Sequence, residues 1–286
     1  MKSKTQKTKN LIGVMLSVLL AVSCSDDDKT PETVDDGQVG TISLGTHRLS
    51  TFSQVNDTEY LVVFESGHGY NTTGWFTNNL VDVIAQQSDV LLYDRAGYGD
   101  SEMGPGPRNI ERLSSELAAV IDQYALGRKV ILVSHSLGGL IARDYAIKHP
   151  SKVASMLFLD VSHEAYNDPS PEKEDMVYDI TASNFGVTHG ATMEIRELSE
   201  GLEYAATLPN LPDVPVIAIS GMKEDAASAA RNEFHGKTTQ EWYDAHEELG
   251  EGITDFTHIG AQNVGHFVFI DDAELVIQAI QQLLAK

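Results

Sequence analysis

Short apolar runs alternate along the chain with segments in which apolar residues recur every three or four positions. The runs are rich in valine, isoleucine and leucine, which is typical of strands buried on both faces of a sheet. They occupy 60–64, 90–93, 130–133, 155–159, 214–220 and 256–259. The segments of helical periodicity lie at 74–87, 109–124, 140–149 and 271–283. This alternation predicts an α/β fold with a mostly parallel, doubly wound sheet, preceded by two short antiparallel strands at 39–44 and 47–52.

The run 130–133 leads directly into Ser134-His135-Ser136-Leu137-Gly138-Gly139, and a helical pattern that ends at His149-Pro150 follows. A strand, a tight turn with serine at its apex and a helix packed closely by small residues form the nucleophile turn of serine hydrolases. Such a turn exposes the Ser136 hydroxyl at the carboxyl edge of the sheet and directs the Leu137 amide toward the same point. Ser136 is therefore the candidate nucleophile.

The first small position of this turn holds Ser134, where the usual pattern Gly-x-Ser-x-Gly has glycine. The position must be small because strand and helix crowd against it, and serine adds only a hydroxyl. The alternative is a connection in which serine and glycine merely relieve crowding in an α/β protein. The rest of the chain has to decide between the two.

A second candidate segment, Glu65-Ser66-Gly67-His68-Gly69-Tyr70, follows the run 60–64. Glycines on both sides of His68 let the chain turn sharply and present free backbone amides. We expect the amides of His68 and Leu137 to form an oxyanion hole, in which each donor contributes about 3–4 kcal/mol in the transition state. The alternative is a glycine-rich turn with the His68 side chain in solvent.

The segment Asp94-Arg-Ala-Gly-Tyr-Gly-Asp-Ser101 follows the run 90–93. Its glycines are too few for a dinucleotide-binding fingerprint, and they open no helix. Together with the loop at 67–69, the Ser136 turn and a late Gly265-His266, this segment resembles the ordered landmarks of the α/β-hydrolase superfamily over residues 39–286. The resemblance implies that 94–101 is structural, with Asp94 and Arg95 paired.

Three of these segments are similar in particular to a bacterial branch of small esterase-like hydrolases. They are Glu65-Ser66-Gly67, Asp160-Val-Ser-His-Glu164 and Gly265-His266. The resemblance assigns the catalytic base to His266, which lies between the last strand and the last helix. Its role would be to take the Ser136 proton and return it to the leaving group.

The acid that supports His266 has two candidates. Asp160 follows the run 155–159, where dehalogenase-like members of the superfamily carry their acid. Asp225 lies four residues beyond Gly221, after the run 214–220, and most members place the acid three residues beyond that glycine. Either would orient the imidazole and stabilise its cation. Two further options are Glu224 and Glu164.

Residues 161–212 contain prolines, acids and two helical patterns, at 173–182 and 191–206. The resemblance implies that this insertion is a mobile cap over the active site, where it selects substrates.

The N-terminus reads as an export signal. Four lysines among the first nine residues precede the apolar run 11–22, and small residues lead from it to Cys24. The run is shorter than the roughly 20 residues of a membrane-spanning helix. The position of Cys24 resembles the lipobox of bacterial lipoproteins, which implies a signal peptide at 1–23, a lipid on Cys24 and an acidic tether at 24–38. We expect an exported, membrane-anchored protein on the periplasmic or cell-surface side of the outer membrane.

Composition narrows the possible partners. The formal net charge of −22 argues against nucleic acid and against an anionic membrane surface, so the Cys24 lipid is the expected membrane contact. A single cysteine excludes an intrachain disulfide. The 286 residues fit one hydrolase domain at 39–286, with its cap at 161–212.

The favoured hypothesis is a serine hydrolase that cleaves a carboxylic ester of a small or medium substrate, in preference to an amide, through an acyl-enzyme. It requires no metal and no cofactor. The serine at 136 argues against dehalogenase and epoxide hydrolase chemistry, which need a carboxylate at that apex, whereas a cofactor-free perhydrolase or an acyltransferase would use the same residues. A non-catalytic ligand-binding lipoprotein is the alternative from another class, and the retained Ser136, Gly-His loop and His266 argue against it.

Overall fold

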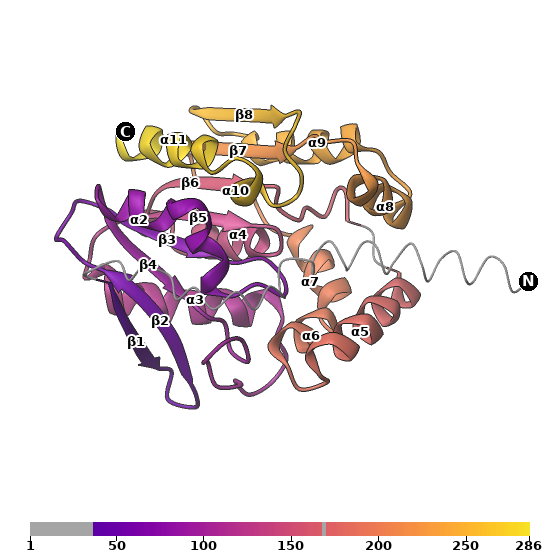
Figure 1. Cartoon of the computed structure of the whole chain (residues 1–286), viewed down its shortest axis with the longest axis horizontal. Helices are drawn as coiled ribbons and strands as arrows, with labels where there is room; N and C mark the ends of the chain where they lie inside the picture. The colour runs from indigo at the N-terminus through magenta and orange to yellow at the C-terminus, as the bar shows by residue number, and fades with distance from the viewer. Residues whose placement is uncertain (1–36, 168–169) are drawn as a thin grey trace, which may run out of the picture.

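An eight-stranded sheet in the order β1-β2-β4-β3-β5-β6-β7-β8 runs through the centre of the molecule (Figure 1). The computed structural model describes residues 37–167 and 170–286. β2 is antiparallel to both of its neighbours, and the other pairs are parallel, so the predicted α/β class with a mostly parallel sheet is confirmed. The strands are β1 Gln38–Ser43, β2 Arg48–Gln54, β3 Leu61–Glu65, β4 Asp89–Tyr93, β5 Val130–His135, β6 Val153–Leu159, β7 Val216–Gly221 and β8 Phe256–Ala261.

Every predicted strand is present, with its ends within two residues of the apolar run that predicted it. The expected signal peptide at 1–23, Cys24 and the tether as far as residue 36 lie outside the described residues.

The sheet separates two hydrophobic cores, because successive side chains of a strand point to opposite faces. On β3, Leu61 and Val63 belong to the core that includes α3 (Ile110–Ala125) and α4 (Gly138–Lys148). Val62 and Phe64 belong to the opposite core, with α2 (Leu80–Ala85) and α11 (Ala273–Leu284). Burial on both faces explains why the central strands are apolar without interruption.

The prediction of a single helix at 74–87 is wrong. The chain forms a 3₁₀ segment, η1 (Thr72–Asn79), before α2. Thr77 is extended, with ψ of 138°, and Asn78 and Asn79 have φ of 56° and 58°. Asparagine adopts this left-handed region more readily than most residues, so the two asparagines permit a break in the helix. The hydrophobic periodicity does not show the break, because polar residues at these positions also fit the exposed face of one continuous helix.

The expected cap insertion contains three helices between β6 and β7. They are α5 (Pro171–Phe185), α6 (Gly190–Ile195) and α7 (Leu198–Ala205), and the pattern at 191–206 is thus divided between two helices. Figure 1 shows them grouped on the side toward which the parallel strands point. The remaining segments are α8 (Ala226–His235), α9 (Thr239–Glu247), α10 (Val268–Asp271), η2 (Pro150–Lys152) and η3 (Glu248–Gly250).

Candidate active site

Ser136 lies at the apex of the turn between β5 and α4, with a left-handed φ of 53°. The residues after it must be small. A Cβ on Gly138 would lie 2.6 Å from the carbonyl oxygen of Glu65, and one on Gly139 would lie 2.4 Å from Cβ of Val161. The strand, the turn and the helix are therefore in the close arrangement that exposes a serine hydroxyl above the sheet.

Ser134 fits the crowded first position of this turn. Its side chain is fully buried, and its hydroxyl donates a long hydrogen bond of 3.4 Å to the carbonyl of Leu157. Serine thus stands where the usual motif has glycine, and the turn still closes.

The structure brings Ser136, His266 and Asp160 into one hydrogen-bonded chain. The Ser136 hydroxyl lies 3.1 Å from Nε2 of His266, and Nδ1 of His266 lies 2.7 Å from Oδ2 of Asp160. A carboxylate at Nδ1 requires the proton on that nitrogen, which leaves Nε2 free to accept the serine proton. The three residues come from the ends of β5 and β6 and from the loop after β8, which meet at the carboxyl edge of the sheet.

Asp160 is buried and follows β6 with a left-handed φ of 47°. Its Oδ1 accepts hydrogen bonds from the Gly221 amide at 2.7 Å and from Nε1 of Trp242 at 2.6 Å. Burial opposes ionisation of this carboxyl, but the hydrogen bond and charge of His266 and the charge of Arg231 outweigh it and lower its pKa to about 2. Asp160 is therefore a charged and firmly oriented partner for the imidazole.

The other candidate acids are engaged elsewhere. Asp225 is the N-cap of α8, where its carboxylate accepts hydrogen bonds from the amides of Ala227 and Ser228 at 2.9 and 3.0 Å. Glu164 forms a two-pronged ion pair with Arg143, and Glu224 is exposed. The structure thus pairs His266 with Asp160 rather than with Asp225. The reason is local: an aspartate just before a helix satisfies the free amides of its first turn.

The loop 67–69 approaches the Ser136 turn closely. A Cβ on Gly67 would lie 2.7 Å from Nδ1 of His135 and 3.0 Å from Cβ of Ser136, so only glycine fits. In the part of the chain that the structure describes, neither the His68 amide nor the Leu137 amide donates a hydrogen bond. The position of the loop leaves these two amides as the candidate donors to an oxyanion.

The side chain of His68 does not extend into solvent, in contrast to the alternative considered above. It is half-buried, and its Nε2 lies 3.0 Å from the carbonyl oxygen of Ala191 in α6. Burial lowers the pKa of His68, so the neutral ring donates through Nε2. The loop after β3 is thereby connected to the cap.

The prediction that Asp94 and Arg95 form an ion pair is also wrong. Arg95 instead binds Glu65, at 2.9 Å, and Glu194 of α6, at 2.8 Å. Asp94 accepts a hydrogen bond from the Thr72 amide at 2.8 Å. The two adjacent side chains therefore bind different parts of the molecule rather than each other.

Sequence reasoning missed two residues that hold the site. His135 is buried, and its Nε2 lies 2.9 Å from the carbonyl oxygen of His266. Burial and the charge of His266 lower the pKa of His135 to about 3, so the ring is neutral and donates this bond. The role of His135 could have been inferred from its position next to Ser136 in the sequence. The role of Trp242 could not, because Trp242 lies 82 residues from Asp160 in the chain.

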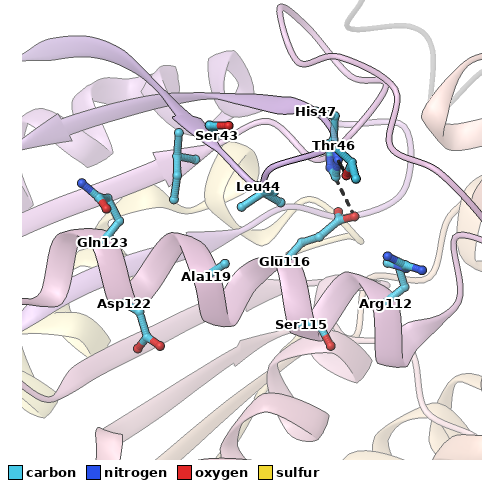
Figure 2. A pocket seen from close by; sticks show the side chains of 11 residues that line it. Ser43, Leu44, Thr46, His47, Arg112, Ser115, Glu116, Ala119, Asp122 and Gln123 are labelled. Atoms are coloured by element: carbon cyan, nitrogen blue, oxygen red, sulfur yellow. Dashed lines mark hydrogen bonds and ion pairs between the residues drawn. The ribbon is translucent and has the colours of Figure 1, made fainter.

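An open groove of about 610 Å³ lies elsewhere, between the β1–β2 hairpin and α3. Figure 2 shows His47 and Glu116 facing each other across it, with 3.4 Å between Nε2 and Oε1. The groove contains none of the residues of the Ser136 chain, so it is separate from the candidate site.

Within residues 37–167 and 170–286, no helix has the length and apolarity to cross a membrane. No group of three or more histidine, cysteine or acidic side chains in the same residues could hold a metal ion.

Comparison with known proteins identifies the fold family. Residues 60–263 match a family described as alpha/beta hydrolase fold. The protein YqjL of Bacillus subtilis, itself uncharacterised, is 24% identical over 224 residues, which cover 77% of this chain and 81% of YqjL.

Solved structures of two kinds of hydrolase share the fold. A thermophilic esterase from Thermogutta terrifontis has a TM-score of 0.65 at 17% identity and covers 87% of this chain and 98% of its own. The epoxide hydrolase VrEH1 from Vigna radiata has a TM-score of 0.67 at 17% identity, with 88% and 99% covered. At such identities the likeness shows the fold alone, so the chemistry has to come from the site.

Proposed function

Since the chain belongs to the alpha/beta hydrolase fold family, we propose that it is a serine hydrolase that cleaves a carboxylic ester, in preference to an amide, through an acyl-enzyme. The observation that carries the proposal is the chain of hydrogen bonds from Ser136 through His266 to Asp160. Epoxide hydrolase chemistry would need a carboxylate in place of Ser136.

In the acylation step, Oγ of Ser136 attacks the carbonyl carbon of the ester, and Nε2 of His266 takes the hydroxyl proton. Asp160 stabilises the imidazolium that results. The negative charge on the former carbonyl oxygen lies near the His68 and Leu137 amides, which would donate hydrogen bonds to it. As the tetrahedral intermediate collapses, the ester bond breaks and His266 gives its proton to the departing alcohol.

Deacylation repeats these steps with water as the nucleophile. His266 removes a proton from the water that attacks the acyl carbon, and then returns it to Oγ of Ser136 as the carboxylic acid leaves. The cycle ends with a free serine and an unchanged histidine.

The test is a comparison of the wild type with Ser136→Ala. A fluorophosphonate probe should label the folded wild type and leave the variant unlabelled. Turnover of p-nitrophenyl butyrate should fall by about 10⁶-fold in kcat, as expected when a serine nucleophile is removed. A folded wild type that resists the probe, or a variant that hydrolyses the ester at the wild-type rate, would contradict the proposal.

We also propose that the enzyme is anchored by a lipid on Cys24, on the basis of the N-terminal sequence alone. Cys24→Ala should move the protein from the membrane fraction to the soluble fraction. Metabolic labelling with a clickable fatty acid should be lost in the same variant, and labelling that persists would overturn this part of the proposal.

A further inference from the structure

Two acidic side chains and an arginine are buried together beside the loop that carries His68. Glu65 ends β3, Arg95 lies in the loop after β4, and Glu194 belongs to the cap helix α6. Their side chains are 0%, 2% and 1% exposed. Buried ion pairs contribute little net stability, because desolvation offsets their attraction. The function of this cluster is therefore better judged from the backbone groups that it binds.

The Arg95 guanidinium also binds two backbone carbonyls of the loop. Nη1 donates to the Ser66 oxygen at 2.5 Å, and Nη2 donates to the Gly67 oxygen at 3.0 Å. In a trans peptide the carbonyl and the next amide point in opposite directions. By holding the carbonyl of Gly67, Arg95 fixes the direction of the His68 amide on the other side of that peptide.

The peptide that follows His68 is held by the same cluster. The Gly69 amide donates to the hydroxyl of Tyr98 at 3.2 Å, and this hydroxyl donates to Oε2 of Glu194 at 2.6 Å. Both peptide planes next to His68 are thus tied, through Arg95 or Tyr98, to one carboxylate of the cap.

The cap helix makes two further contacts to these loops. The amide of Gly190, at the start of α6, donates to the Gly97 carbonyl at 3.0 Å, and the ring of His68 binds the Ala191 carbonyl. A Cβ on Gly190 would lie 2.5 Å from the carbonyl oxygen of Ala96, so the helix is packed directly against the backbone. α6 is therefore fixed to the loops after β3 and β4.

We propose that Glu194 is a positioning residue of the oxyanion hole. It holds Arg95 and Tyr98, these hold the peptides on either side of His68, and the His68 amide is thereby directed toward the oxyanion on Ser136. The cap thus completes the catalytic site. This inference rests on the proposed serine hydrolase function.

Glu194→Gln tests the inference, because an amide group cannot accept from Arg95 and Tyr98 through both of its heavy atoms. Loss of a single oxyanion donor lowers kcat by about 10²–10³-fold. For a donor that is misdirected rather than removed, we expect kcat for p-nitrophenyl butyrate to fall by about 10–100-fold, with KM within about threefold of wild type. A trifluoromethyl ketone, which Ser136 converts to a tetrahedral oxyanion, should lose affinity by a similar factor.

Asp89→Asn is the matched control. Asp89 is also a buried carboxylate paired with an arginine, Arg128, but it lies at the opposite end of β4 from the Arg95 loop. This variant should lose stability in thermal unfolding while kcat and inhibitor affinity stay within about twofold of wild type.

Tyr98→Phe provides a second test, and it decides the matter if Glu194→Gln does not fold. It releases the Gly69 amide and removes a donor to Glu194, and we expect kcat to fall by about tenfold at constant KM. Wild-type kcat and inhibitor affinity in a folded Glu194→Gln or Tyr98→Phe would overturn the inference. Equal losses of kcat in Asp89→Asn would also overturn it, because they would reflect destabilisation alone. Fluorophosphonate labelling of Ser136 in the wild type separates these outcomes from failure of the proposed function.

Discussion

The two strands next to β5 both lead into a buried carboxylate, and these carboxylates are held in opposite ways. Glu65 ends β3 and Asp160 follows β6, so the Ser136 turn lies between them. Asp160 accepts hydrogen bonds from two uncharged N–H groups and from His266. Glu65 instead meets the Arg95 guanidinium, which it shares with a second carboxylate in the cap.

The pKa values of the two carboxyls move in opposite directions. Burial opposes ionisation of Asp160, but the hydrogen bond and charge of His266 and the charge of Arg231 outweigh it and lower its pKa to about 2. Burial raises the pKa of Glu65 to about 7, although Arg95 and Tyr93 oppose it. The direct hydrogen bonds that Gly221 and Trp242 donate to Asp160 are uncharged, and the Arg231 guanidinium lies farther away, at 3.9 Å from Oδ2, so the carboxylate keeps a charge that acts on His266. On the β3 side, the Arg95 guanidinium is shared between Glu65 and Glu194, and this arrangement is suited to fixing the backbone of the loop after β3.

The largest expected effect comes from removing the charge of Asp160. Asp160→Asn should lower kcat by about 10⁴-fold, because an amide at this position favours the wrong tautomer of His266. Steady-state hydrolysis of a p-nitrophenyl ester measures the change, and KM should remain close to the wild-type value.

Asp225→Asn is the control, because Asp225 was the other candidate for the acid. The variant weakens the cap of α8, which we expect to lower the free energy of unfolding by about 1 kcal/mol or less, with kcat within about twofold of wild type. If Asp225→Asn reduced kcat by orders of magnitude while Asp160→Asn did not, the contrast between the two sides of Ser136 would be wrong.

The next effect concerns the uncharged donor to Asp160. Trp242→Phe keeps an aromatic ring but removes the N–H that binds Oδ1. A hydrogen bond to a charged group contributes about 1.5–3 kcal/mol, so we expect the free energy of unfolding to fall by about that amount. A less firmly oriented carboxylate should also lower kcat, by about tenfold.

The other tryptophan is a matched comparison on the opposite side. Trp75 is equally buried, and its N–H binds the uncharged hydroxyl of Ser66 at 2.9 Å. Trp75→Phe should therefore lower the free energy of unfolding by about 0.5–1.5 kcal/mol, the contribution of a neutral hydrogen bond. Urea unfolding of both variants gives the two values, and a larger loss at Trp75 would contradict the assignment of Asp160 as the charged acceptor.

The positions of the strands along the chain, their burial on both sheet faces and the Ser136 turn could be predicted from the sequence because each depends on neighbouring residues. Apolar runs identify buried strands, and the small residues after Ser136 reflect crowding within one turn. The break at Asn78 and Asn79 could not be predicted, since polar residues at those positions also suit a helix surface. Here the backbone conformation, rather than the periodicity, decided the structure.

The partners of the charged residues could not be predicted, because they depend on contacts between distant parts of the chain. Asp160 and Asp225 both follow strands that reach the same edge, and only the meeting of Asp160 with His266, 106 residues away, separates them. Arg95 was expected to pair with its neighbour, but it meets Glu194 from the cap, 99 residues away. Residue patterns within a short stretch of sequence cannot predict contacts between residues that are about 100 positions apart.

The two carboxylates should give opposite dependences of stability on pH. Between pH 4.5 and about 7 the unfolded chain releases the Glu65 proton and the folded protein retains it, so stability falls by about 2–3 kcal/mol as pH rises. Below pH 3.8 the unfolded chain binds a proton at Asp160 and the folded protein does not. Stability there falls by about 2 kcal/mol as pH decreases toward 2.

Urea unfolding of Glu65→Gln and Asp160→Asn from pH 2.5 to 8 separates the two contributions. Glu65→Gln should flatten the decline toward pH 7, and Asp160→Asn should flatten the decline in acid. Each variant serves as the control for the other, because the second carboxyl is intact in it. Slopes identical to wild type in both variants would show that the two environments do not differ as described.

The smallest effect is expected at Ser134, which lies between the two sides. It pairs with Glu65 of β3 on one side and with Phe158 of β6 on the other. Ser134→Gly restores the usual motif, removes one long hydrogen bond and adds backbone freedom, so we expect the free energy of unfolding to fall by about 1 kcal/mol or less. Ser134→Val, in contrast, overpacks the same space and should lower it by about 1–3 kcal/mol. If kcat is unchanged in the glycine variant and falls in the valine variant, the size of the side chain alone governs position 134. The difference between the Glu65 side and the Asp160 side then comes from the partners of each carboxylate and not from β5, which lies between them. A large gain in kcat on restoring glycine would instead show that Ser134 distorts the turn between them.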